Sequence, residues 1–226
     1  MDVSGDFLLK GAWYAYEQCG RLLEDAVILF DNKRYSSAVA LAMFAREELG
    51  KAEILTGFWF DVQMGRTVDL KCIDMEITKH LLKQEKGRLS LTQRARGDTQ
   101  LGQAIKTMQG HEPGTTEFDE AAKILDVAAD AQIKRFPGSR HDARMKALYV
   151  DHDEMGKEWI VPRELTVDWA AVLVFDALND YSVKRDNLQP HQLEFAKPLL
   201  LKAFEQWPER PELPLVRRPA LSEDSV

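Results

Sequence analysis

Two arginine–histidine pairs in this 226-residue chain have the residue types and the short spacing of metal-independent ribonuclease sites. Arg135 precedes His141, and Arg185 precedes His191, with five residues between the partners in each pair. A histidine can move a proton to or from a ribose 2′-hydroxyl while an arginine fork holds the scissile phosphate. Because such pairs also arise by chance, their spacing alone does not identify a site.

The sequence around the two pairs separates them. Arg135 is followed by Phe-Pro-Gly, which places that pair on a loop of undefined shape. Arg185 lies at the predicted end of one helix and His191 in the first turn of the next, so both side chains are expected in one cleft between helices. We therefore predict Arg185 as the phosphate clamp and His191 as the acid–base catalyst. The alternative is a helix-terminal arginine beside a surface histidine.

Six cations between residues 79 and 96 form the most basic region of this acidic chain. They are Lys79, Lys83, Lys86, Arg88, Arg94 and Arg96. The lysines are spaced by four and three residues, so on a helix they share one face, with His80 nearby. This stripe is either a solvated helix face or a surface that follows the phosphates of RNA.

The central helix is predicted over residues 34–60, where apolar residues lie on nearly all sides. Glu48 falls within the apolar stripe, and a buried carboxylate requires a partner. It is either an internal anchor for a neighbouring helix or part of a functional site. Glu47 and Lys51 have the favourable i,i+4 order of an ion pair. Gly50 lies inside the predicted helix, where glycine lowers helix stability by about 1 kcal/mol relative to alanine. A glycine at such a position is explained if another backbone approaches closely, so we predict such a contact at Gly50.

The remaining pattern predicts a helical domain with one inserted region. Helices are expected over residues 5–30, 34–60, 69–94, 116–133, 166–185 and 190–207, with Pro198 as the alternative start of the last one. Short β-prone runs at 147–151 and 157–162 predict a small hairpin. We expect a single domain over residues 1–207, in which residues 97–162 are an inserted elaboration. A proline-rich, flexible tail is expected over residues 208–226.

Composition and charge restrict the class of protein. Hydrophobic content of 45% and charged content of 30% are ordinary for a globular domain. A net charge of -7 argues against a nucleic-acid-binding coat over the whole surface but permits a local basic patch. The sequence has no run of about 18 apolar residues and no signal-peptide pattern, so we expect no membrane span and a cytoplasmic location.

The motifs disfavour metal and cofactor chemistry. A ferritin-like di-metal bundle needs Glu-x-x-His pairs on two helices, and the spacing from Glu76 to His80 is one residue too long. Cys19 and Cys72 form no CxxC or Cys/His cluster, and the chain has no P-loop, GxGxxG or GxSxG motif. We therefore expect no metal ion and no cofactor.

Several segments resemble the HEPN superfamily of helical bundles. They are the opening helix containing Arg21-Leu-Leu-Glu-Asp-Ala, the turn ending in Arg34-Tyr35, and residues 38–52. Within that superfamily, three segments resemble the AbiV family of abortive-infection proteins: Glu-Glu-Leu-Gly-Lys at 47–51, His80-x-x-Lys83, and Leu148-Tyr149-Val150-Asp151. The resemblance covers residue 5 to about residue 185.

This resemblance implies an all-α, antiparallel up-and-down bundle that forms a homodimer and defends bacteria against phage. HEPN proteins commonly carry an Arg-polar-x(3–4)-His motif for RNA cleavage at a dimer interface, and Arg185 with His191 fits that motif. By this resemblance the chain is a metal-independent endoribonuclease that acts on RNA or the translation machinery. A phage-encoded protein would be its trigger.

The alternative implied by the resemblance is a non-catalytic HEPN module that binds RNA, a nucleotide or a protein partner. Its binding site would be a polar cluster of family-like residues: Glu47, Glu48, Lys51, His80, Lys83, Tyr149 and Asp151. The same residue types would also satisfy a buried Glu48 inside the bundle.

Overall fold

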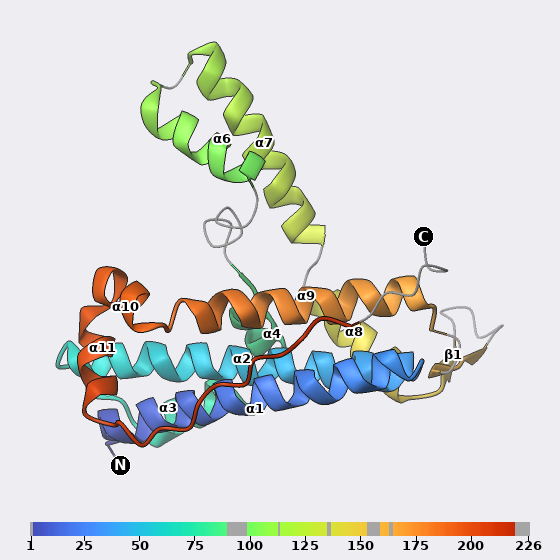
Figure 1. Ribbon diagram of the computed structural model, residues 1–226, viewed down its shortest axis with the longest axis horizontal. Coiled ribbons are helices and arrows are strands. Elements are labelled where there is room, and N and C mark those ends of the chain that lie inside the picture. Colours follow the sequence, from blue (N-terminus) through green and yellow to red (C-terminus); the bar gives the residue numbers. More distant parts are fainter. Residues whose placement is uncertain are drawn as a thin grey trace. The chain divides into compact units, whose positions relative to one another are not determined.

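The computed structural model describes residues 2–89, 99–112, 114–134, 137–152, 159–162 and 165–219. These residues form ten helices and one pair of short strands (Figure 1), so the predicted all-α architecture is confirmed. The chain divides into two compact units. The first unit comprises Met1–Arg88 and Arg140–Val226, and the second comprises Leu89–Ser139.

Three long helices form the core of the first unit. Helix α1 covers Gly5–Asp31, α2 covers Tyr35–Gln63 and α9 covers Val167–Asp186, close to the predicted bounds. A turn in which Lys33 has a positive φ of 58° joins α1 to α2, and the two helices pack as the expected antiparallel hairpin. Ser4 caps α1 and Thr166 caps α9, each accepting a hydrogen bond from a backbone amide three residues on.

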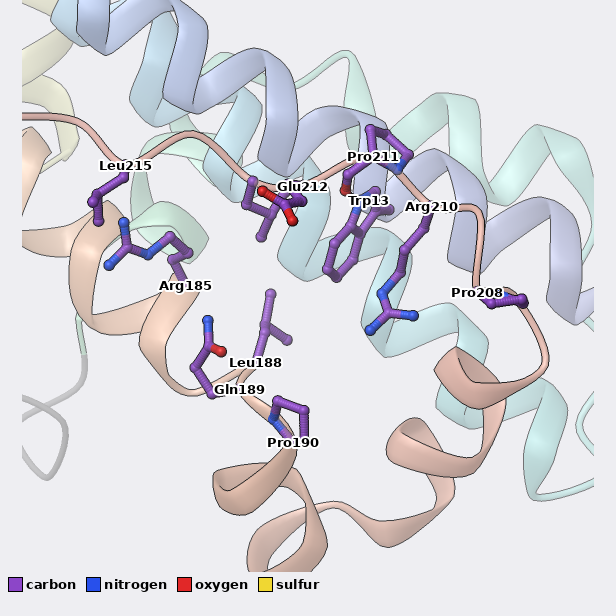
Figure 2. A pocket seen from close by; sticks show the side chains of 11 residues that line it. Trp13, Arg185, Leu188, Gln189, Pro190, Pro208, Arg210, Pro211, Glu212 and Leu215 are labelled. Atoms are coloured by element: carbon purple, nitrogen blue, oxygen red, sulfur yellow. Dashed lines mark hydrogen bonds between the residues drawn. The ribbon is translucent and has the colours of Figure 1, made fainter.

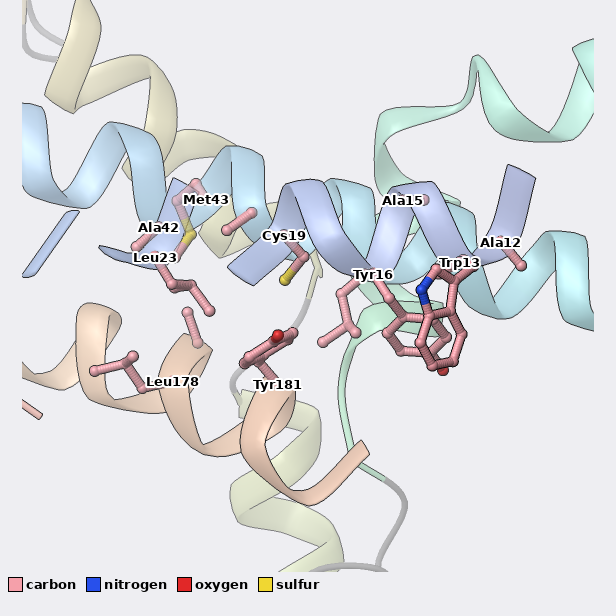
Figure 3. Packing of buried hydrophobic residues seen from close by; sticks show 14 of the residues in the cluster. Ala12, Trp13, Ala15, Tyr16, Cys19, Leu23, Ala42, Met43, Leu178 and Tyr181 are labelled. Carbon is pink, nitrogen blue, oxygen red and sulfur yellow. The ribbon is translucent and has the colours of Figure 1, made fainter. Parts of the chain in front are cut away.

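The side chains between these helices are packed without solvent access. Figure 3 shows Tyr181 of α9 facing Cys19 of α1, with Leu23 and Met43 beside them. All four are at most 1% exposed. This interior is the main apolar cluster of the first unit, and it fixes the relative positions of α1, α2 and α9.

The prediction of one continuous helix over residues 69–94 is wrong. It is two helices, α3 over Leu70–Ile77 and α4 over His80–Gly87, because the backbone turns at Thr78 and Lys79. The turn lets α4 lie directly on α2. A Cβ added to Gly50 would come within 1.8 Å of the carbonyl oxygen of Lys83, which confirms the predicted close approach at Gly50.

The second unit is a helical pair. Helix α6 covers Thr99–Gly110, and α7 covers Thr116–Lys134, where a helix was predicted. Thr115 caps α7 by accepting a hydrogen bond from the Phe118 amide. Small and apolar side chains close the interface between the two helices: Leu101, Ala104 and Ala121.

The hairpin predicted from residues 147–151 and 157–162 is not seen with those strands. Ala147 and Leu148 end helix α8, which covers Pro137–Leu148. The strand pair is limited to β1, Asp151–His152, and β2, Trp159–Ile160. Ala143 and Ala147 are buried at helical spacing, so burial of a small-residue helix face prevails over the local β-propensity.

The C-terminal part of the first unit contains two short helices and an extended segment. Helix α10 covers Pro190–Ala196 and α11 covers Pro198–Glu205, so the one helix predicted over 190–207 is divided at Pro198. The tail was expected to be flexible from residue 208. Its described part, to residue 219, instead makes hydrogen bonds with α1 and α9.

The inserted elaboration also has different bounds from those expected, because residues 140–162 group with the first unit.

Among the described helices, none has both the length and the apolar character that crossing a membrane requires.

Candidate functional site

The buried carboxylate of α2 is Glu47, not Glu48. The Glu47 side chain is 6% exposed, whereas that of Glu48 is 26% exposed and lies 3.5 Å from Lys51 Nζ. The predicted Glu47–Lys51 pair is therefore replaced by Glu48–Lys51. Successive helical residues differ by about 100° in direction, so the exchange places Glu47 against α4 and α8.

Three basic side chains converge on Glu47, and these four residues are called the Glu47 cluster. His80 Nδ1 lies 2.6 Å from Glu47 Oε2, and Lys83 Nζ lies 3.3 Å from the same oxygen. Arg144 donates a hydrogen bond of 2.6 Å from Nη1 to the other oxygen, Glu47 Oε1. Each oxygen of the buried carboxylate thus has a charged or ionisable partner, as its burial requires.

The Glu47 cluster has two properties beyond internal satisfaction. First, Lys83 and Arg144 carry two positive charges against the one negative charge of Glu47, before any charge on His80 is counted. Second, the His80 side chain is 50% exposed while its Nδ1 is held by Glu47. This arrangement orients the ring, leaves part of it in contact with solvent, and places it beside two cationic side chains.

A second polar cluster lies on an adjacent side of α2 and is called the Arg46 cluster. It consists of Tyr16, Arg46, Glu53, Asp180 and Lys184. Arg46 donates from Nη1 to Asp180 Oδ2, and both side chains are at most 1% exposed. Lys184 Nζ lies 3.2 Å from Glu53 Oε1, and it also donates to the Lys86 carbonyl at 3.1 Å.

Burial keeps two weak acids in and beside the Arg46 cluster in their neutral forms, the Tyr16 hydroxyl and the Cys19 thiol. Burial, followed by the charge of Glu53, raises the pKa of Tyr16 well above 10.0, and the Tyr16 hydroxyl donates a hydrogen bond to Glu53. Burial also raises the pKa of the Cys19 thiol, so Cys19 is not an activated nucleophile. The Arg46 cluster balances two cations against two anions.

The predicted catalytic pair, Arg185 and His191, lies at the C-terminal end of α9 and the start of α10, directly after Lys184 of the Arg46 cluster. Arg185 Nη2 donates to Asp186 at 2.7 Å, and Arg185 Nη1 donates to the Pro214 carbonyl at 3.4 Å. Figure 2 shows Arg185 on the wall of a cavity of about 540 Å³ that His191 does not line. His191 is exposed, and no hydrogen bond joins it to Arg185 among the described residues.

Among the other predicted site residues, Glu48, Lys51 and Tyr149 lie away from the Glu47 cluster, and the side chain of Asp151 is not described. Glu48 and Lys51 line a separate cavity of about 480 Å³ between α1, α2 and α3. Tyr149 is 56% exposed after the end of α8, and Asp151 begins β1. The lysine stripe is also divided, because Lys83 is buried at 8% exposure while Lys79 and Lys86 are exposed. Arg94, Arg96 and the pair Arg135–His141 lie outside the residues whose side chains are described.

Arg144 and the residues of the Arg46 cluster were not identified from the sequence. Arg46 lies on the central helix, where only its contact with Asp180 of α9 and its complete burial mark it. Its partner Asp180 is one of several acidic residues in a helical segment, and nothing in the local sequence marks it as buried. Arg144 was hidden by the strand predicted over 147–151, although the i,i+4 pair Ala143 and Ala147 is a helical signal.

Within the described residues, no group of three or more His, Cys, Asp or Glu side chains is arranged to hold a metal ion. In comparisons with known proteins, a family model of the HEPN type, described as AbiV, matches residues 7–178. This range contains every residue of the Glu47 cluster and ends before Arg185. No curated protein matches the chain, and no solved structure matches it.

Proposed function

The chain belongs to the AbiV family of HEPN proteins, and on that premise we propose that it is an RNA-targeting effector whose site is the Glu47 cluster. Membership of this family indicates a role in abortive infection, the defence of bacteria against phage. The further step, action on RNA that arrests translation in infected cells, is our proposal.

The observation that carries this proposal is a half-exposed histidine oriented by a buried carboxylate beside two cationic side chains. His80 is oriented through Nδ1 by Glu47 at 2.6 Å, and Arg144 Nη1 lies 3.4 Å from the same ring nitrogen. A ribose-phosphate needs a proton acceptor near the 2′-hydroxyl and positive charge near the phosphate. His80 supplies the first, and Lys83 with Arg144 supplies the second through their field.

In the proposed reaction, His80 accepts the proton of a ribose 2′-hydroxyl through Nε2. The 2′-oxygen then bonds to the adjacent phosphorus, and the bond from phosphorus to the 5′-oxygen breaks. The leaving 5′-oxygen takes a proton from water, which gives a 2′,3′-cyclic phosphate and a 5′-hydroxyl. Glu47 acts as a positioning residue, because it fixes the ring through the opposite nitrogen.

The test is cleavage of total bacterial RNA by the purified protein in EDTA, with three histidine variants in parallel. We expect His80→Ala to reduce cleavage at least about 100-fold, the usual contribution of a general base. His111→Ala is the matched control, because His111 follows α6 in the second unit and its Nδ1 forms a local hydrogen bond with the Thr107 carbonyl. Full cleavage by His80→Ala would overturn the assignment of the Glu47 cluster.

The third variant, His191→Ala, separates the two candidate sites. Arg185 lines a cavity, which favours it as a second phosphate-binding position. Loss of cleavage in His191→Ala but not in His80→Ala would transfer the activity to the Arg185–His191 pair. Equal cleavage by all variants would indicate a contaminant, and the nuclease proposal would be dropped.

A second candidate function is a non-catalytic module that binds RNA. It is favoured by the burial of Lys83 and Arg144. Their side chains alone are 11% and 9% exposed, and Glu47 neutralises part of their charge. This function predicts retention of RNA without cleavage, and a loss of retention in His80→Ala. The homodimer and the phage-encoded trigger remain proposals that belong to both functions.

A further inference from the structure

The C-terminal strap, residues 208–218, has a regular proline pattern. Pro208, Pro211 and Pro214 recur at every third residue, in the sequence Pro-x-x-Pro-x-x-Pro. A polyproline II segment has three residues per turn, so these three prolines share one face. From residue 211 onward the strap forms neither helix nor strand, and it runs along α1 in Figure 1.

Two side chains from different helices bind the strap through its carbonyl oxygens. Trp13 of α1 donates from Nε1 to the Pro211 carbonyl at 2.7 Å. Tyr181 of α9 donates from its hydroxyl to the Pro214 carbonyl at 2.9 Å. The two acceptors are one polyproline turn apart. Aromatic donors that contact the carbonyls of a proline-rich segment are the usual means of recognising such segments.

A glycine provides the space for one proline ring. A Cβ added to Gly20 of α1 would lie 2.9 Å from Cβ and Cγ of Pro214 and 2.5 Å from the Tyr181 hydroxyl. Any larger side chain at this position would therefore displace both the ring and the donor that binds it. Gly20 costs helix stability, so its presence is explained by the close approach of the strap.

An ion pair fixes the far end of the strap. Arg217 Nη2 lies 2.5 Å from Asp31 Oδ2 at the end of α1. Pro211 and Arg217 are six residues apart, about 19 Å in a polyproline helix, and Trp13 and Asp31 are separated by about 27 Å along α1. The reach of the arginine side chain accounts for the remainder. The strap therefore lies parallel to α1, with matched contacts at both ends.

We propose that the groove between α1 and α9 is a binding site for an extended proline-rich segment of the pattern Pro-x-x-Pro-x-x-Pro-x-x-Arg. The C-terminal strap is its resident ligand in cis, and a partner protein with the same pattern is the ligand in trans. The strap is suited to exchange, because every one of its residues is at least partly exposed. It also lies outside residues 7–178, the part of the chain that the family model matches.

Displacement of the strap has a direct structural consequence. The Pro214 carbonyl accepts hydrogen bonds from both Tyr181 and Arg185, so removal of the strap takes one acceptor from each side chain at once, while Arg185 keeps its contact with Asp186. The strap also forms one wall of the cavity in Figure 2, through Arg210, Pro211 and Glu212. A partner that replaces the strap would therefore remodel the surface around Arg185.

The test uses the full-length chain and a fluorescent peptide with the sequence of residues 206–219. In the wild type the strap competes at an effective concentration in the millimolar range, so the peptide binds weakly. Pro211→Ala combined with Pro214→Ala weakens this competitor. We expect fluorescence anisotropy to show at least tenfold tighter peptide binding to this variant. A scrambled peptide should not bind.

Gly20→Ala in the strap-weakened background tests the groove itself. It should weaken peptide binding at least tenfold because of the clash with Pro214 and Tyr181. Gly57→Ala is the matched control, since Gly57 lies on an exposed part of α2 with no atom within 4 Å of an added Cβ. No binding to a folded strap-weakened variant, or equal binding with Gly20→Ala, would overturn the proposal.

A milder variant covers the case in which the double proline change unfolds the protein. Arg217→Glu changes a side chain that is 63% exposed and removes only the terminal ion pair with Asp31. We expect it to tighten binding of the peptide about threefold, consistent with the small free energy of an exposed ion pair. Unchanged or weaker binding would contradict a strap that is held in part by Asp31.

Discussion

The Glu47 cluster and the Arg46 cluster lie on adjacent sides of α2, and they differ in solvent access and in charge balance. Arg46 and Asp180 are fully buried, and the cluster pairs two cations with two anions. The Glu47 cluster instead joins three basic side chains to one carboxylate and contains a histidine that is half exposed. A closed cluster holds helices together, whereas a cluster of cations with a solvent-exposed ring can also meet an anion.

The two clusters arise from neighbouring residues because one helical step changes direction by about 100°. Arg46 points toward α9, and Glu47 points toward α4 and α8. Gly50, one turn further along, allows the α4 backbone to contact α2. Burial of a charge on this helix therefore does not by itself identify a functional site. The clusters differ in His80, whose half-exposed ring is the most accessible side chain of either one, whereas Glu53 of the Arg46 cluster is 27% exposed.

The largest effect on stability is expected at the closed cluster. Arg46→Ala would leave the Asp180 carboxylate buried without its ion-pair partner Arg46, which typically costs about 3–5 kcal/mol in the free energy of unfolding. Urea denaturation would measure this loss. Replacement of both partners, Arg46→Met with Asp180→Leu, should recover most of it. A loss below about 1 kcal/mol for Arg46→Ala would contradict the structural role.

The next effect is expected where α4 contacts α2. Gly50→Ala places a Cβ 1.8 Å from the Lys83 carbonyl oxygen, so a backbone segment must move, at a cost of about 1–3 kcal/mol. Because Lys83 belongs to the Glu47 cluster, RNA cleavage should fall as well. Gly57→Ala, with open space at the same helix, should stabilise by up to about 1 kcal/mol. Equal thermal midpoints for the two variants would contradict the close contact.

A smaller, pH-dependent effect on stability is expected from the buried acids in and beside the Arg46 cluster, which are Tyr16, Tyr181 and Cys19. The pKa values of Tyr16 and Tyr181 are raised by burial, so both prefer the neutral form in the folded protein. Their contribution to stability is present below pH 10 and is lost as the pH rises further, at up to about 1.4 kcal/mol per pH unit for each group. The raised pKa of Cys19 adds to this from about pH 9.

Tyr16→Phe tests this sign directly. The variant should lose about 1 kcal/mol at neutral pH with the hydrogen bond to Glu53, but its stability should fall less steeply above pH 10 than that of the wild type. Urea denaturation between pH 7 and 11 would measure both slopes. A steeper fall in Tyr16→Phe would mean that Tyr16 is ionised in the folded state.

The smallest effect on stability is expected at the open cluster. His80→Ala removes a half-exposed side chain, so the free energy of unfolding should change by at most about 0.5 kcal/mol while RNA cleavage is lost. Thermal unfolding beside the cleavage assay would measure both. A destabilisation above about 2 kcal/mol would place His80 with the structural residues and remove the contrast between the clusters.

The sequence predicts the long helices well because their signals are local. Apolar spacing defines α1, α2 and α9, and Thr166 marks the start of α9. The close contact predicted at Gly50 is also confirmed. A glycine inside a helix lowers helix stability, and close approach of another backbone is one of the few reasons for its presence.

The sites were less predictable because they depend on distant partners. Glu47 and Glu48 are both glutamates on an apolar helix, and only the positions of α4 and α8 decide which one is buried. Arg144 lies 97 residues from Glu47 in the chain, beyond any spacing rule. The break at Thr78 and Lys79 likewise follows from the packing of α4 on α2, not from a local stop signal.

The most direct test of the central claim is NMR of the five histidine rings as a 2′-O-methyl RNA is added, since this RNA binds without being cleaved. We expect the ring signals of His80 to shift and those of His111 to stay unchanged. Shifts at His191 with none at His80 would contradict the Glu47 cluster as the RNA site and move that site to Arg185 and His191. Signals that all stay unchanged at saturating RNA would contradict action on RNA through either histidine.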